Sequence, residues 1–92
     1  MDKPRIQVDF NELLETNLIF LSKTDERENS EGSIIKLSEG VHVSLYEFNH
    51  YDDGVKEYLL AEGTVELNTI QEKPVAKWCC RINENGISIK NT

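Results

Sequence analysis

Apolar and polar residues alternate along most of this chain with a period of two, which is the pattern of β-strands buried on one face. The longest such stretch, residues 41–68, predicts two strands that fold back on each other across a turn at 51–54. Gly54 supplies the left-handed backbone that this turn needs, and Gly63 predicts a bend in the second strand. The second strand is apolar on both faces at 58–60, so we expect it in the middle of the fold.

Three shorter strands are predicted before this hairpin, and the one nearest to it contains Ile34, Ile35 and Leu37. Residues 5–10 alternate, with Ile6 on the buried face and Arg5 on the opposite, solvent face. Residues 18–21 are apolar throughout, which favours a strand that is covered on both sides. Between them, residues 11–17 fit either a single helical turn or a bent continuation of the first strand.

The remaining segments predict a loop and a second hairpin. Residues 23–33 contain no apolar side chain and are rich in charge, Asn, Ser and Gly, so we expect a mobile acidic loop. Near the end of the chain, the Asn-Gly pair at 85–86 is a strong hairpin-turn signal. A two-residue loop would pair Ile82 with Ile89, and a four-residue loop would pair it with Ile87.

The whole pattern predicts one all-β domain over residues 1–92, a small antiparallel barrel or sandwich. It would contain about six or seven short strands and at most one short helical turn. In strand number and length such a domain resembles SH3-like and OB-type barrels, but no sequence motif adds to that similarity. A connection is expected at 69–75, where Pro74 marks a strand start or a sheet edge.

Charge narrows the classes of partner. The chain carries 17 acidic and 10 basic residues and a net charge of −7, spread along its whole length. Such a surface keeps a protein in solution or attracts a basic partner, and it disfavours nucleic-acid binding, which relies on Lys and Arg. No apolar run has the length of a signal peptide or a membrane span, so we expect a cytoplasmic protein without membrane association.

The two cysteines, Cys79 and Cys80, are neighbours and do not form an ordinary disulfide. Successive side chains on a strand point to opposite faces, so Cys80 is expected to be buried beside Trp78 and Cys79 to be exposed. Cys79 would then lie between Lys77 and Arg81, and two cations lower the pKa of a thiol. It is therefore a candidate reactive thiol, the alternative being an ordinary surface thiol in the one compact basic stripe that the pattern predicts.

No residue pattern indicates a cofactor, a metal site or a catalytic centre. His42 and His50 would lie roughly 25 Å apart on a straight strand, too far to share a metal ion. His50 is followed closely by Asp52 and Asp53, but aspartates in a turn usually accept hydrogen bonds from local backbone N–H groups. We expect no enzyme, and a small ligand-binding or enzymatic barrel that uses His50, Asp52 or Cys79 is the least favoured alternative.

The candidate binding residues lie on the second face of the first hairpin strand and in its turn. They are Tyr46, Phe48, His50, Tyr51, Asp52 and Asp53. Phe48 on a nominally polar face indicates either a bulge near Glu47 or a surface patch. The aromatic side chains either pair across strands within the fold or form an acid-rimmed patch that docks a protein partner or a second copy.

We therefore expect a non-enzymatic protein–protein interaction module, with self-association as one form of that interaction. The alternative is an acidic inhibitor, of the immunity type or a nucleic-acid mimic, that binds a basic partner.

Overall fold

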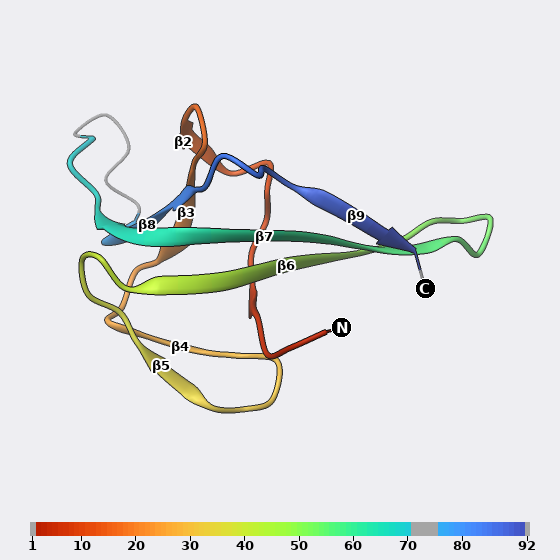
Figure 1. The fold of residues 1–92 in the computed structure, drawn as a ribbon, viewed down its shortest axis with the longest axis horizontal. Coiled ribbons are helices and arrows are strands. Elements are labelled where there is room, and N and C mark those ends of the chain that lie inside the picture. The colour runs from red at the N-terminus through yellow and green to blue at the C-terminus, as the bar shows by residue number, and fades with distance from the viewer. Residues whose placement is uncertain (1, 71–75, 92) are drawn as a thin grey trace.

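The computed structural model describes residues 2–70 and 76–91, and these residues form nine strands and no helix (Figure 1). The strands are β1 (Ile6–Gln7), β2 (Leu13–Glu15), β3 (Leu18–Ser22), β4 (Glu26–Glu28), β5 (Ile34–Lys36), β6 (His42–His50), β7 (Lys56–Leu67), β8 (Trp78–Ile82) and β9 (Ser88–Asn91). The predicted all-β class is confirmed, with more strands than expected.

The main sheet has the strand order β1-β6-β7-β8-β3-β2, and β9 pairs with a further part of β7. β4 and β5 form a separate two-stranded sheet. The described pairs are antiparallel except that of β1 with β6, which is parallel. The sheet is therefore mixed and not purely antiparallel as expected, because the chain reaches β6 from β1 by a long crossover through the intervening strands.

The predicted central hairpin is confirmed. β6 and β7 pair without a break in register from His42 opposite Thr64 to His50 opposite Lys56. β7 also pairs with β8 and β9, so it lies in the middle of the sheet, as its apolar run predicts. No bulge interrupts the pairing near Glu47, so the alternative of a surface patch holds for Phe48.

Two apolar clusters cover opposite faces of the sheet at β3 and β8. The buried residues of the main cluster are Ile6, Val8, Phe10, Ile19, Leu21, Leu37, Val43, Leu45, Ala61, Val65, Cys80 and Ile82. The second cluster is formed by Leu14, Leu18, Ala76 and Cys79, with Phe20 and Ile70 packed against it. β3 is thus covered on both sides, which confirms the prediction from its apolar run.

Gly63 is required by space rather than by backbone conformation. A methyl group on Gly63 would lie 2.4 Å from Cys80 Sγ and 2.6 Å from the Arg81 carbonyl oxygen. β7 continues through this position, with Gly63 paired to Val43 on one side and to Ile82 on the other. The glycine therefore marks a close approach of β7 and β8.

Two local expectations are corrected. Residues 11–17 form neither a helical turn nor an extension of β1, because β2 is a separate strand that pairs with β3 through a turn at Asn17, which has a φ of 61°. The stretch 23–33, expected to be a loop, contains β4, whose partner β5 follows it. The connection at 69–75, with Pro74, lies mostly outside the described residues.

The predicted second hairpin is wrong. β8 and β9 do not pair with each other, since both pair antiparallel with β7, one after the other along its length. Residues 83–87 lie between them, and this segment turns at Asn83–Gly86, where Gly86 N donates to Asn83 O at 3.0 Å and Gly86 has a φ of 67°. The Asn-Gly signal thus forms a turn within an interrupted strand, because the edge of β7 was free to receive both segments.

Candidate functional site

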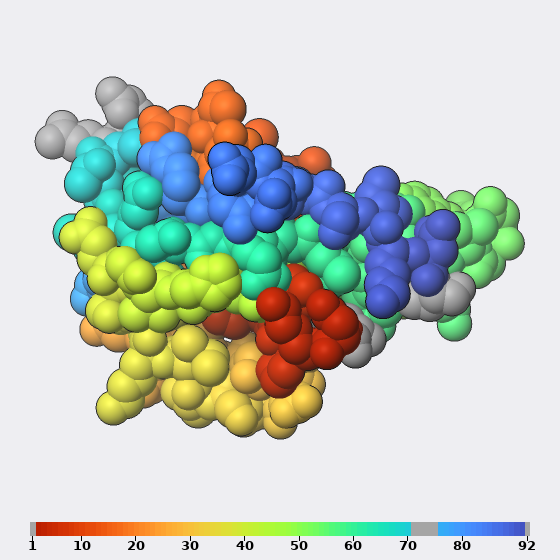
Figure 2. All heavy atoms as spheres, viewed as in Figure 1, coloured from red at the N-terminus to blue at the C-terminus, as the bar shows by residue number. Residues whose placement is uncertain are grey.

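The part of the β6–β7 hairpin from Tyr46 to Leu60, together with β9, forms an arm that projects from the rest of the fold. It accounts for the elongated outline of the molecule, whose principal extents are 40 × 28 × 23 Å. Figure 1 shows the hairpin turn at the far end from β4 and β5, and Figure 2 shows this end protruding on the right. All six candidate binding residues lie on this arm.

A row of aromatic side chains lies on one face of the arm. The ring centroids of Phe48 and Tyr58, which are cross-strand partners, are 5.0 Å apart, and those of Tyr46 and Tyr58 are 6.2 Å apart. His50 continues the row, with its centroid 6.4 Å from that of Phe48. Phe48 is 40% exposed, and His50 is also exposed. The row therefore combines the two expected alternatives, since the rings pair across strands and still present a surface.

The turn residues hold one another in place. Asp53 Oδ1 accepts a hydrogen bond from Val55 N at 3.0 Å, as expected for an aspartate in a turn, and Gly54 has a φ of 86°. Tyr51 Oη donates to Glu57 Oε1 at 2.6 Å. This bond to the Glu57 carboxylate raises the pKa of Tyr51. The carboxylates of Asp53 and Glu57 therefore bind residues close to them in sequence, within the turn and the start of β7.

The acidic residues near the arm are divided between its two faces, so only part of the expected acid rim lies beside the rings. Glu47 and Glu57 lie on the face opposite the aromatic row, because side chains alternate along a strand. Glu47 Oε1 accepts a hydrogen bond from Phe10 N at 3.0 Å on that side. On the aromatic face, exposed Lys56 and Lys90 are the cross-strand partners of His50 and Tyr58. Asp52 and Asp53 of the tip lie beyond one end of the row, and Glu62, the cross-strand partner of Ser44, lies beyond the other end on the same face.

Cys79 is buried, not exposed as expected. Its side chain lies in the second apolar cluster, where Leu14, Leu18 and Ala76 pack on this face of the sheet. Burial raises the pKa of the Cys79 thiol to about 11, and the pKa of Cys80 to about 12. Thiolate, the reactive form, is thus disfavoured at both positions.

The predicted basic stripe has its cations paired within the chain. Lys77 Nζ lies 2.6 Å from Asp25 Oδ1. The Arg81 guanidinium binds Glu66 and Glu15, at 3.1 Å and 2.9 Å, and both bonds raise the pKa of Arg81. Lys77 and Arg81 are therefore already paired with carboxylates of the same chain.

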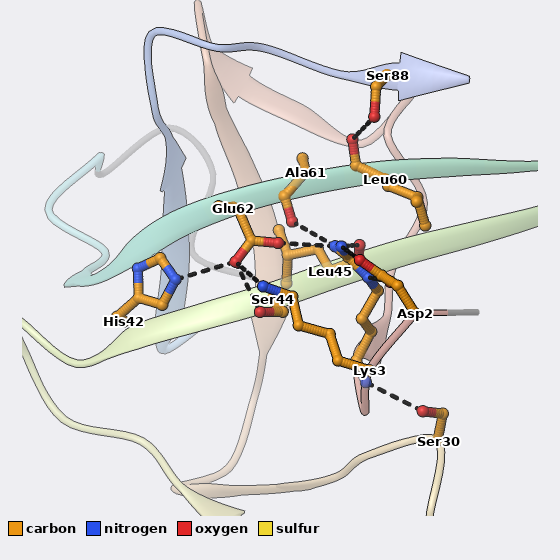
Figure 3. A network of polar contacts seen from close by, with 11 residues as sticks. Asp2, Lys3, Ser30, His42, Ser44, Leu45, Leu60, Ala61, Glu62 and Ser88 are labelled. Atoms are coloured by element: carbon orange, nitrogen blue, oxygen red, sulfur yellow. Dashed lines mark hydrogen bonds and ion pairs between the residues drawn. The ribbon is translucent and has the colours of Figure 1, made fainter. Parts of the chain in front are cut away.

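A polar network centred on Arg5 and Glu62 was not predicted. The Arg5 side chain is only 5% exposed, and its Nη1 donates to Glu62 Oε2 at 2.8 Å and to the carbonyl oxygens of Leu45 and Ala61. Its other nitrogens donate to both carboxylate oxygens of Asp2 at 3.0 Å. Figure 3 shows this cluster between the N-terminal segment and the β6–β7 hairpin.

Glu62 is the acceptor on which the network converges. Its Oε1 accepts hydrogen bonds from Ser44 Oγ at 2.7 Å, His42 Nε2 at 3.0 Å and Lys3 Nζ at 3.1 Å. Burial acts to raise the pKa of Glu62, but these bonds and the charge of Arg5 outweigh it and lower the pKa to about 2. Glu62 therefore stays ionised near neutral pH, and its bonds to Lys3 and Arg5 hold the N-terminal segment against β6 and β7.

Arg5 was missed although the alternation placed it correctly opposite Ile6. The pattern indicates the face of a side chain, and it cannot indicate that the N-terminal segment lies against β6 and β7. The residues next to an arginine in the sequence do not indicate whether its guanidinium binds backbone carbonyls, as that of Arg5 does, or lies in solvent.

An open cleft of about 1010 Å³ lies between the β4–β5 sheet and the start of β8. Trp78 and Ile34 contribute apolar walls. Its polar groups bind one another, since Trp78 Nε1 donates to Asp25 Oδ1 at 2.8 Å and Lys77 Nζ lies 5.6 Å from the Trp78 ring centroid. The bond from Lys77, followed by that from Trp78, lowers the pKa of Asp25.

Residues 2–70 and 76–91 contain no group of three or more His, Cys, Asp or Glu side chains that could hold a metal ion. They also contain no helix long and apolar enough to cross a membrane. The comparisons found no matching family model, no matching curated protein and no matching solved structure.

Proposed function

We propose that this protein is a non-enzymatic protein-binding module whose partner docks on the aromatic face of the arm. The observation that carries the proposal is the row of neighbouring, mutually tilted rings at Tyr46, Phe48, His50 and Tyr58, on a part of the chain that projects from the rest of the fold. Aromatic side chains are enriched in protein interfaces and contribute much of their binding energy.

The row is already ordered in the free protein, which favours binding. Phe48 and Tyr58 pack on each other across an unbroken strand pair, so their rotamers are restricted before a partner arrives. Ordering a free side chain at an interface costs about 0.5–1.5 kcal/mol, and this cost is reduced here. None of the four ring residues belongs to the main apolar cluster, so the aromatic surface can change without loss of the core.

The charges around the row define the complementary surface. Lys56 and Lys90 flank the rings, and Asp52 and Asp53 lie beyond one end. A fitting partner presents an apolar or aromatic centre with acidic groups beside it and a basic group at the tip. This pattern fits a protein surface, since it contains neither a continuous basic groove nor a continuous acidic one.

Affinity capture with three baits tests the proposal: the wild-type protein, Phe48→Ser and Leu67→Ser. Leu67 is 45% exposed on β7 outside the arm and is the matched control. We expect a partner that the wild type and the Leu67→Ser bait retain and that the Phe48→Ser bait loses, with both variants folded by circular dichroism. A partner set that is identical for all three baits would refute the assignment of the aromatic face.

The acidic-inhibitor alternative has one observation in its favour. Four of the described bases are engaged in ion pairs, those of Lys3, Arg5, Lys77 and Arg81. Exposed acids of β4 and the loop after it, Glu26, Glu28 and Glu31, lie on the other end of the molecule, where Lys36 is the cross-strand partner of Glu26. This candidate predicts partner binding that weakens steeply between low and high salt, and binding that is insensitive to salt would exclude it.

A further inference from the structure

The outer edge of β9 is open in the described structure. β9 pairs with β7 on one side, and none of residues 2–70 and 76–91 pairs with its other side. All four residues of β9 are exposed. An open strand edge presents unsatisfied backbone donors and acceptors that can pair with another chain.

The hydrogen-bond pattern between β7 and β9 determines which residues of β9 direct their backbone groups to this open edge. In an antiparallel pair, every second residue directs its N–H and C=O groups to the same neighbour. On β7 the even-numbered residues face β8 and β9, since the Glu62 carbonyl accepts a hydrogen bond from Asn83 N on that side. The pairs of this kind between β7 and β9 are Leu60–Ser88 and Tyr58–Lys90. Ile89 and Asn91 therefore direct their backbone groups to the open edge.

Ile89 also has the most exposed large apolar side chain among the described residues, at 65%. Its cross-strand partner Leu59 packs against the main apolar cluster. An apolar side chain next to the core and beside an open edge gains from a further strand that covers it.

We propose that two copies of this chain associate through β9, as antiparallel strands with Ile89 opposite Ile89 of the second copy. This register pairs the outward backbone groups of both isoleucines and brings the two side chains together on one face. It sets Lys90 opposite Ser88 of the second copy. The next register that uses the same backbone groups sets Lys90 opposite Lys90, which like-charge repulsion disfavours.

Charge favours this edge over the other free edge of the arm. β9 contains no acidic residue, whereas the free part of β6 leads directly into Asp52 and Asp53. Two copies that each carry a net charge of −7 therefore meet with less acid–acid repulsion along β9 than along β6. The shared strand pair is short, so the interface is smaller than the roughly 1,200 Å² of stable complexes, and the dimer is weak and concentration-dependent.

The symmetry axis of such a pair is perpendicular to the sheet, because identical antiparallel strands lie side by side. The two arms then form one continuous sheet, with both aromatic rows on the same face. This inference uses the edge of β9 and does not rest on the proposed partner of the aromatic face.

Sedimentation analysis from about 10 µM to about 1 mM tests the inference, with Ile89→Lys, Ile89→Glu and their equimolar mixture beside the wild type. We expect the wild type to dimerise and each single variant to associate at least about tenfold more weakly, because like charges then face each other. The mixture recovers the dimer, since a lysine faces a glutamate in the proposed register. Ile34→Lys, which changes a 58% exposed isoleucine on β5, is the matched control and associates like the wild type.

A wild type that stays monomeric over the whole range would overturn the inference and leave the edge to an extended segment of another protein. A dimer that persists in Ile89→Lys and in Ile89→Glu alike would equally refute it. Circular dichroism of each variant shows that a loss of association is not a loss of fold.

Discussion

Replacing Gly63 with alanine tests whether the close approach of β7 and β8 sets the identity of this residue. In an open strand the change would be favourable by about 0.5–1 kcal/mol, because glycine loses more backbone freedom on folding than alanine. The structure predicts the opposite sign. The added methyl would lie 2.4 Å from Cys80 Sγ and 2.6 Å from the Arg81 carbonyl oxygen.

The size of the effect follows from these contacts. Unstrained contacts between heavy atoms lie at about 3.5–4.0 Å, so each of the two contacts must open by about 1 Å. The Arg81 carbonyl is backbone and cannot rotate away without disturbing the β7–β8 pair. Overpacking of this kind costs about 1–3 kcal/mol, and we expect a loss of about 3 kcal/mol. A domain of 92 residues has a free energy of unfolding of about 5–14 kcal/mol, so the loss is large.

Urea unfolding followed by fluorescence of Trp78, the single tryptophan, measures the effect. Thr64→Ala, at the neighbouring exposed position of β7, is the control and should cost below about 1 kcal/mol. Cys80→Ala in the Gly63→Ala background removes the contact with sulfur but not the one with Arg81, so it should recover only part of the loss. A Gly63→Ala protein as stable as the wild type, or more stable, would refute the reasoning.

Three further predictions concern the polar network and the thiols. Arg5→Met should lower the free energy of unfolding by about 3 kcal/mol, because it removes the cation that lies nearest to the partly buried carboxylate of Glu62. Lys3→Met removes an exposed ion pair with the same carboxylate and should lower the free energy of unfolding by less than about 1 kcal/mol in the same urea assay. Stability should fall as pH drops from about 4.5 to about 2, because the pKa of Glu62 lies lower in the folded protein than in the unfolded chain, and Glu62→Gln should flatten this part of a pH series of thermal melts; an unchanged slope would contradict it. Cys79 and Cys80 should resist a thiol reagent in the folded protein at pH 8 and react fully in urea, and rapid labelling of Cys79 without urea would contradict its burial.

Much of the fold is encoded locally and was predictable. The alternation in residues 41–68 sets both the β6–β7 pair and its turn, because two strands joined by a short turn have one register that buries the apolar face. The apolar run at 18–21 correctly predicted a strand covered on both sides. The aromatic row was also predictable, since residues 46, 48 and 50 must share a face of any strand they form.

The errors concern partners distant in sequence. Asn85-Gly86 does form a turn, but β8 and β9 on either side of it both pair with β7, because the long edge of β7 offers more backbone partners than a local hairpin. Cys79 was assigned the correct face of β8, and its predicted exposure was wrong because Leu14, Leu18 and Ala76 pack on that face. The local sequence around these residues indicates neither the pairing of β9 with β7 nor the burial of Cys79.

The sequence alone thus determined the strand class, the central hairpin and the face on which most side chains lie. Only the tertiary structure decided which strands pair, which faces are covered and where charges meet, as Arg5 shows by its position against the carbonyls of Leu45 and Ala61. The physical reason is the distance along the chain over which each feature is determined. Alternation is a property of neighbouring residues, whereas pairing and burial depend on competition among all free edges and apolar faces of the chain.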